Sequence, residues 1–175
     1  MSEDDRNNEG KQGQGRRARA LDGRTYLVVY EDGENFEKAL NYALKLVRYH
    51  KGYLALAYLY KPSSGGAVTW GNVEDIMKRE AREEAEKALW KIARQIQEKH
   101  DIMPCLFIEE GSATEALPKI ARKENSVDAL ILSSQSSQDG LQAALHYFTS
   151  KGAGKLNVPM IMVPAHLPFE DIQKL

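Results

Sequence analysis

The sequence predicts a doubly wound α/β domain of the Rossmann-like type, with a five-stranded parallel sheet in the order 3-2-1-4-5 and helices on both faces. Five short apolar runs are typical of buried strands, and amphipathic segments separate most of them. Strands joined by helices favour a parallel sheet because right-handed crossovers are strongly preferred. With 175 residues, of which 42% are hydrophobic, the chain is long enough for one such domain.

The first predicted unit is a strand, a helix and a second strand. Residues 25–30, TYLVVY, form a continuous apolar run, as expected of a strand covered on both faces. The next segment places its apolar residues on one helical face. They are Ala39, Leu40, Ala43, Leu44 and Val47. Gly52 is expected to close this helix, and residues 53–60, YLALAYLY, form the second strand.

A loop and a long helix follow. Residues 61–71 are rich in Gly, Ser and Pro, which predicts a mobile loop. The helix is predicted over residues 72–99, with Glu, Lys and Arg facing water. Its buried stripe is expected to consist of Ala85, Ala88, Leu89, Ile92 and Ile96. Trp90 lies off this stripe and is expected to be half-exposed.

The third strand is predicted over residues 102–108, at an edge of the sheet. Pro104 lacks the N–H that a central strand needs on both sides, so it places this strand at an edge. Ser112 and Glu115 have the spacing of a capping box, which predicts that the Ser112 hydroxyl accepts from the Glu115 amide. Pro118 is expected to strain the early turns of the helix that follows.

The last predicted elements are a strand at 129–132, a helix at 140–148 and a strand at 158–163. In the order 3-2-1-4-5 the winding reverses between the first and fourth strands. Ligands of such sheets bind at that point, outside the carboxyl ends of the strands. The candidate site therefore brings residues 31–34 opposite residues 133–139.

Composition limits the partners and the location. Lys and Arg number 24 and Asp and Glu number 25, so no global field favours nucleic acid or a membrane. Cys105 is the only cysteine, and no apolar run approaches the roughly 20 residues that span a bilayer, so a cytoplasmic location is expected.

Residues 1–22, which include Arg16, Arg17 and Arg19, are expected to be a disordered tail. Residues 23–166 are expected to form the domain and residues 167–175 a C-terminal tail.

Several linked segments carry a family resemblance. The first strand and helix of the universal stress protein family are similar to the segment VVYEDGENFEKALNYAL. The third helix and fourth strand of that family are similar to IEEGSATEALPKIARKENSVDALILSSQ, and its closing strand is similar to NVPMIMV. The resemblance covers residues 25–164. It implies a dimeric α/β domain, produced in stress or growth arrest, in which one branch binds ATP and another does not. It also implies that the fifth strand pairs across a two-fold axis.

The ATP-binding branch carries glycines after the fourth strand, as G-x-x-G, nine residues, then G-[ST]. Glycines let such a loop close on phosphates, with its amides and the next helix N-terminus holding the charge. In this sequence Ser133 and Ser136 stand at the first two glycines. Strict spacing places the third on His146, and only a three-residue insertion lets Thr149 and Ser150 stand for G-[ST]. The aspartate that binders carry after the first strand corresponds to Glu31 or Asp32.

Two functions remain open from the sequence. Serine at a position that needs φ > 0 costs of order 1–2 kcal/mol, which favours a non-enzymatic dimeric stress-response module with weak or absent ATP binding. The alternative is an adenine-nucleotide-binding member that uses ATP with magnesium and hydrolyses it slowly. Its candidate contacts are Glu31, Asp32, Ser133, Ser134, Ser136, Ser137, Thr149 and Ser150.

The fifth strand is the expected dimer edge. Residues Pro159, Met160, Ile161, Met162 and Val163 form a short apolar run, and an exposed apolar edge invites pairing with another chain. The alternative is that the C-terminal LPFEDIQKL covers this strand. No catalytic residue and no metal site are expected. The histidines lack paired spacing for metal, and 152–155, GAGK, lacks the context of a P-loop.

Overall fold

The computed structural model describes residues 23–61, 71–123, 127–136 and 139–174. It contains a five-stranded sheet in the order β3-β2-β1-β4-β5, in which every neighbouring pair is parallel. The strands are β1 (Thr25–Val29), β2 (Tyr53–Tyr60), β3 (Cys105–Glu110), β4 (Val127–Ser133) and β5 (Met160–Val163). The predicted fold class and strand order are confirmed. The predicted N-terminal tail and most of the predicted loop at 61–71 lie outside the described residues.

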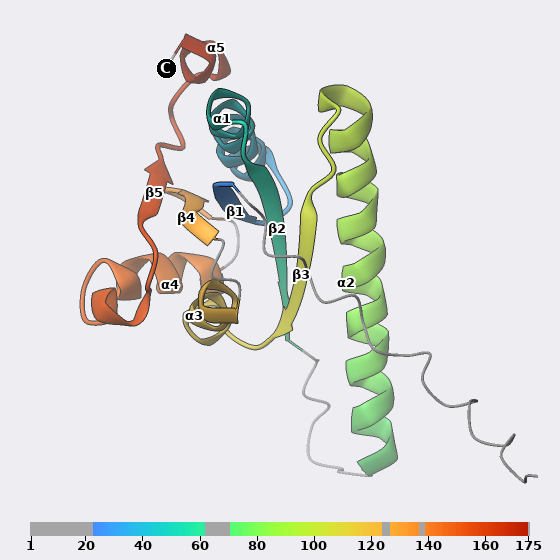
Figure 1. Ribbon diagram of the computed structural model, residues 1–175. Helices are drawn as coiled ribbons and strands as arrows, with labels where there is room; N and C mark the ends of the chain where they lie inside the picture. The colour runs from blue at the N-terminus through green and yellow to red at the C-terminus, as the bar shows by residue number, and fades with distance from the viewer. Residues whose placement is uncertain (1–22, 62–70, 124–126, 137–138, 175) are drawn as a thin grey trace, which may run out of the picture.

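Helices cover both faces of the sheet (Figure 1). One face packs against α1 (Glu34–His50), α2 (Gly71–His100) and α5 (Phe169–Lys174), and the other against α3 (Ala113–Lys123) and α4 (Asp139–Phe148). The short 3-10 helix η1 (Ala153–Lys155) follows α4.

Strand β1 shows why this sequence needs two helical layers. Tyr26 and Val28 point into the α1 side of the core, and Leu27 and Val29 into the α3 side. All four are at most 4% exposed. Because successive strand residues face opposite sides, an uninterrupted apolar run buries all of its side chains only between two layers.

The end of α1 corrects the role expected for Gly52. The left-handed residue that closes the helix is Lys51, with φ 52°, and the Gly52 amide donates to the Val47 carbonyl at 2.9 Å. Gly52 is required for a different reason. A Cβ there would lie 2.2 Å from the carbonyl oxygen of Arg24.

The third strand and the capping box also differ in detail from prediction. β3 begins at Cys105, directly after Pro104, because proline cannot donate to the ladder, and it continues two residues past Ile108. Its edge position is confirmed. The Ser112 hydroxyl donates to the Glu115 carboxylate at 3.0 Å, and the Glu115 amide donates to the Ser112 backbone carbonyl at 3.0 Å. The expected bond from the Glu115 amide to the Ser112 hydroxyl is replaced by this pair.

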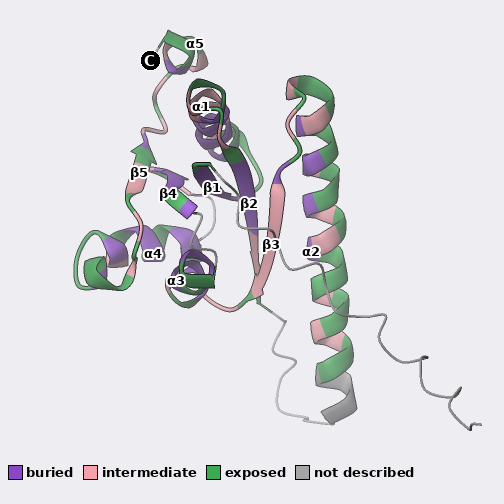
Figure 2. Cartoon of the chain, viewed as in Figure 1, coloured by how far each residue is buried: buried purple, intermediate pink, exposed green. Residues whose placement is uncertain are grey.

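The long helix α2 buries one narrow stripe along the sheet, and its outer face is exposed (Figure 2). Ala85, Leu89 and Ile96 are buried as predicted, whereas Ala88 and Ile92 are partly buried. Trp90 is 50% exposed, in agreement with its place off the stripe.

The residues expected as a C-terminal tail contain α5, which packs on α1 (Figure 1). Ile172 is 1% exposed within the core on that side of the sheet. The Lys45 ammonium donates to the carbonyls of Ile172 and Gln173 at 3.4 and 3.1 Å. Helix α5 therefore belongs to the packed unit. Within the described part of the chain, no helix is both long and apolar enough to cross a membrane.

Candidate functional site

The winding reverses where β1 and β4 lie side by side, as predicted. The chain leaves β1 through Glu31 and enters α1 at Glu34, while the segment after β4 begins at Ser134. Their carboxyl ends meet at the same edge of the sheet, which is where doubly wound folds bind ligands.

A hydrogen bond joins the two sides of this point. The Ser136 hydroxyl donates to a carboxylate oxygen of Glu31 at 2.5 Å, across 105 positions of sequence. Glu31 is only 2% exposed. A buried carboxylate needs strong donors to replace water, and a hydroxyl bonded to a carboxylate is among the stronger neutral-to-charged pairs. The loop after β4 is thus fastened to the end of β1.

The other described serines of this loop are also bonded within the protein. The Ser133 hydroxyl accepts from the Gln135 amide at 3.4 Å. The Ser134 hydroxyl accepts from the Ala165 amide at 2.9 Å, and the Ser134 amide donates to the Val163 carbonyl at 2.8 Å. The structure brings these three serines together with Glu31, and Ser137 lies outside the described residues.

Thr149 and Ser150 lie at the far end of α4. The Thr149 hydroxyl donates to the Leu145 carbonyl at 2.9 Å, and the Ser150 hydroxyl donates to the His146 carbonyl at 2.7 Å. Since α4 has 10 residues, about 15 Å of helix separates them from the serine loop. The structure does not bring these two hydroxyls to the switch point.

Asp32 is bonded to the side chain of Tyr30. The Tyr30 hydroxyl donates to Asp32 at 2.5 Å, and burial together with this carboxylate raises the pKa of Tyr30 to about 12. The Tyr30 ring also stacks on Tyr58 at 5.4 Å between centroids. Of the two acids that the sequence left open, Glu31 accepts a hydrogen bond from Ser136 of the loop after β4.

Lys38 is a residue that the pattern did not single out. It is 7% exposed, forms an ion pair with Glu34 at 2.8 Å and donates to the Ala165 carbonyl at 2.5 Å. Its ammonium also lies 5.7 Å from the centroid of the Phe169 ring. Ser134 is bonded to the amide of Ala165, and Lys38 is bonded to the carbonyl of the same residue. These two bonds fix the segment after β5 beside the loop. The sequence feature that could have pointed to Lys38 is its position next to the apolar face of α1.

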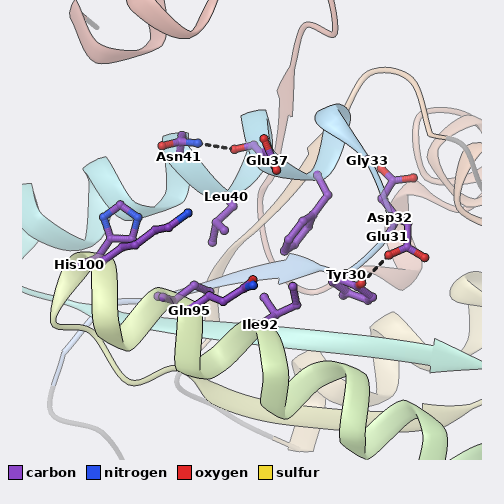
Figure 3. A pocket seen from close by; sticks show the side chains of 13 residues that line it. Tyr30, Glu31, Asp32, Gly33, Glu37, Leu40, Asn41, Ile92, Gln95 and His100 are labelled. Carbon is purple, nitrogen blue, oxygen red and sulfur yellow. Dashed lines mark hydrogen bonds between the residues drawn. The ribbon is translucent and has the colours of Figure 1, made fainter.

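A cavity of about 430 Å³ opens beside the switch point, between α1 and α2 (Figure 3). Tyr30 and Asp32 lie at one end and His100 at the other, and Lys99, which precedes His100 in α2, also lines the cavity. Burial, followed by the nearby charges of Arg48 and Lys99, lowers the pKa of His100. Among the described residues, no group of three or more His, Cys, Asp or Glu side chains is placed to hold a metal.

Strand β5 forms the other border of the sheet. It pairs with β4, and the order of the described strands ends with it. Met162 is 46% exposed, whereas Val163 is 2% exposed and belongs to the core. Pro159 is exposed, and Met160 and Ile161 are partly buried.

Comparison with known proteins agrees with this architecture. The structure resembles universal stress protein UspA from Lactobacillus plantarum (TM-score 0.62, 14% identity), with 80% of this chain and 97% of that chain covered. It also resembles a universal stress protein in complex with cAMP (TM-score 0.53, 15% identity, 81% and 97% covered). A third similar structure is a protein of this family from Burkholderia pseudomallei (TM-score 0.50, 15% identity, 80% and 95% covered).

No curated protein matches the sequence. Because all three sequence identities are low, these structural likenesses show the fold alone. The family is shown by the model of the universal stress protein family, which matches residues 23–164. The chain belongs to the universal stress protein family.

Proposed function

We propose that this protein is a non-enzymatic stress-response module that acts as a dimer, with weak or absent ATP binding. The observation that carries the proposal is the bond from Ser136 to the buried Glu31. It joins the two segments between which a nucleotide at the switch point would have to lie. A ligand there would have to break this bond and satisfy a buried carboxylate in its place, which opposes binding.

The backbone of the loop supports the same conclusion. Among the described non-glycine residues, only Lys51 and Asp101 have positive φ. Ser133 and Ser136 therefore do not adopt the left-handed conformation that glycine permits at a phosphate-binding turn. The loop has a geometry compatible with serine, and its described hydroxyls bond to protein groups.

Dimerisation through β5 is the second part of the proposal. The strand ends the described sheet, is apolar and carries the exposed Met162. Helix α5 packs on α1, and Val163 shares the core on that side of the sheet with Ile172. An apolar border strand with an exposed side chain is suited to pair with a second copy.

The alternative function is adenine-nucleotide binding with magnesium, and one specific observation favours it. A structurally similar universal stress protein is described in complex with cAMP. In this chain such a ligand would need Ser136 to release Glu31, and it would lie at the opposite end of α4 from Thr149 and Ser150.

Equilibrium titration with a fluorescent ATP analogue and magnesium, followed by competition with ATP and cAMP, tests the proposal. We expect no saturable binding below about 1 mM, which corresponds to a binding free energy weaker than about −4 kcal/mol. Binding in the micromolar range that Ser136→Tyr abolishes would instead establish the alternative.

A further inference from the structure

We propose that the cavity between α1 and α2 binds a short zwitterionic peptide, with its amino group at the Asp32 end and its carboxylate at the Lys99 end. This α1–α2 groove has a volume of about 430 Å³, within the range of small-molecule sites. It lies on the α1 and α2 face of the sheet; Glu31 is among its lining residues, whereas Ser133, Ser134 and Ser136 are not. The inference uses neither Glu31 nor its bond to Ser136, so it does not rest on the function proposed above.

The floor of the groove is apolar, as a ligand site requires. Phe36, Leu40 and Ile96 are buried at 4%, 8% and 3% exposure, and the partly buried Ile92 faces Leu40 from the other helix (Figure 3). One apolar side chain of a ligand can lie on this floor and lose its contact with water.

The walls offer groups that suit peptide bonds. Asn41 lies on the α1 wall and Gln95 on the α2 wall. Each side-chain amide has both donors and an acceptor, the same pairing capacity that a peptide group presents. The Asn41 amide group donates to the Glu37 carbonyl at 2.7 Å, which fixes the position of its side chain.

The two ends of the groove carry opposite charge. Glu37 lies in the first turn of α1 and Asp32 just before that helix, and both are exposed. At the other end Lys99 is exposed, and the Arg48 guanidinium lies 2.8 Å from the ring of His100. The helix macrodipoles oppose this polarity with only about half a charge at each terminus, so the full side-chain charges prevail.

The length of the groove selects the size of the ligand. Its lining runs from Gly33 to Asn41 on α1 and from Ile92 to His100 on α2, which is about 12 Å of each helix. An extended tripeptide spans about 10 Å, so its termini reach both charged ends. A nucleotide is disfavoured in either orientation. Its phosphates would meet the acidic end of the groove in one, and in the other the acidic end would have no cation as a partner.

Isothermal titration calorimetry with the tripeptide Ala-Leu-Ala tests the inference. We expect saturable binding with a Kd between about 10 µM and 1 mM. Acetylation of the amino terminus or amidation of the carboxyl terminus should each weaken binding at least about fivefold. No saturable heat at about 5 mM peptide, or equal binding of the free and blocked peptides, would overturn the proposal.

Charge variants locate the site. Lys99→Glu should weaken binding of the free tripeptide at least about fivefold and should not weaken binding of the amidated peptide, because that peptide is a cation and has no carboxylate to lose contact with. Lys91→Glu is the matched control, since Lys91 is exposed on the same helix and does not line the groove. Equal effects of the two variants would place the peptide elsewhere. Circular dichroism of each variant confirms that the fold is retained.

Discussion

Single residues join the segments that meet at the switch point. Glu31 and Ser136 are joined across the sheet edge, and Lys38 and Ser134 together hold the backbone of Ala165. Sequence reasoning pointed to the serines because they occupy positions of a known turn, and it left Glu31 and Asp32 as alternatives after the first strand. It missed Lys38, because an ammonium can bond a distant carbonyl that no local pattern specifies.

Gly52 provides a prediction at this scale. Gly52→Ala should lower the free energy of unfolding by about 2 kcal/mol or more, because the new Cβ would lie 2.2 Å from the Arg24 carbonyl oxygen. Urea unfolding followed by circular dichroism measures the change. Gly154→Ala is the control, since nothing lies within 4 Å of its added Cβ. Equal stability of the two variants would show that the backbone near Arg24 moves freely.

His100 provides a prediction of pH dependence. Its pKa is lowered in the folded protein from an ordinary value of 6.5 by burial and by the charges of Arg48 and Lys99. Below pH 6.5 the unfolded chain therefore binds a proton that the folded chain resists, so stability is complete above that pH and falls as the pH is lowered through it. His100→Gln should reduce the loss of Tm between about pH 7.5 and 5.5. An unchanged loss would contradict this role.

At the scale of elements, strong periodicity predicted which helices and strands exist and distinguished the two types. The alternation of buried strands and amphipathic helices gave β1, β2 and α2 close to their observed bounds. Boundaries differed where a local rule intervened, as at Pro104, which delays β3 to Cys105. Helix α5 was not predicted. Its six residues are too few to show a period, and its packing depends on the distant helix α1.

Helix α5 can be tested as part of the core. Ile172→Ala should lower the free energy of unfolding by about 2–4 kcal/mol, because Ile172 is 1% exposed. Gln173→Ala is the neighbouring control, since Gln173 is exposed. A loss below about 0.5 kcal/mol in Ile172→Ala would mean that α5 is not held against α1 in solution.

At the scale of the whole molecule, the sequence predicted the fold more completely than the site. Strand order follows from crossover handedness and one edge proline, both of which are visible in the chain. The contacts at the switch point depend on side-chain orientations set by packing: Glu31 accepts from Ser136 and Asp32 accepts from Tyr30. The α1–α2 groove lies between two helices that are far apart in sequence, so no local motif predicts it.

Assembly is the prediction that belongs to this scale. Met162→Lys should convert a dimer to a monomer in light scattering, because a charge at an apolar border strand opposes pairing. Met103→Lys is the control, since Met103 is 57% exposed and lies outside β5. A wild-type protein that is already monomeric would contradict dimerisation through β5.

The central claim is that the serine loop is closed against nucleotide by its bond to Glu31. Calorimetric titration of ATP with magnesium into the Ser133→Gly/Ser136→Gly variant and into the wild type tests it most directly, with Ser150→Gly as a control at the far end of α4. The double variant regains both glycines and loses the bond to Glu31, so we expect it to bind at least about tenfold more tightly than the wild type. Micromolar binding by the wild type, not improved in the double variant, would contradict the claim.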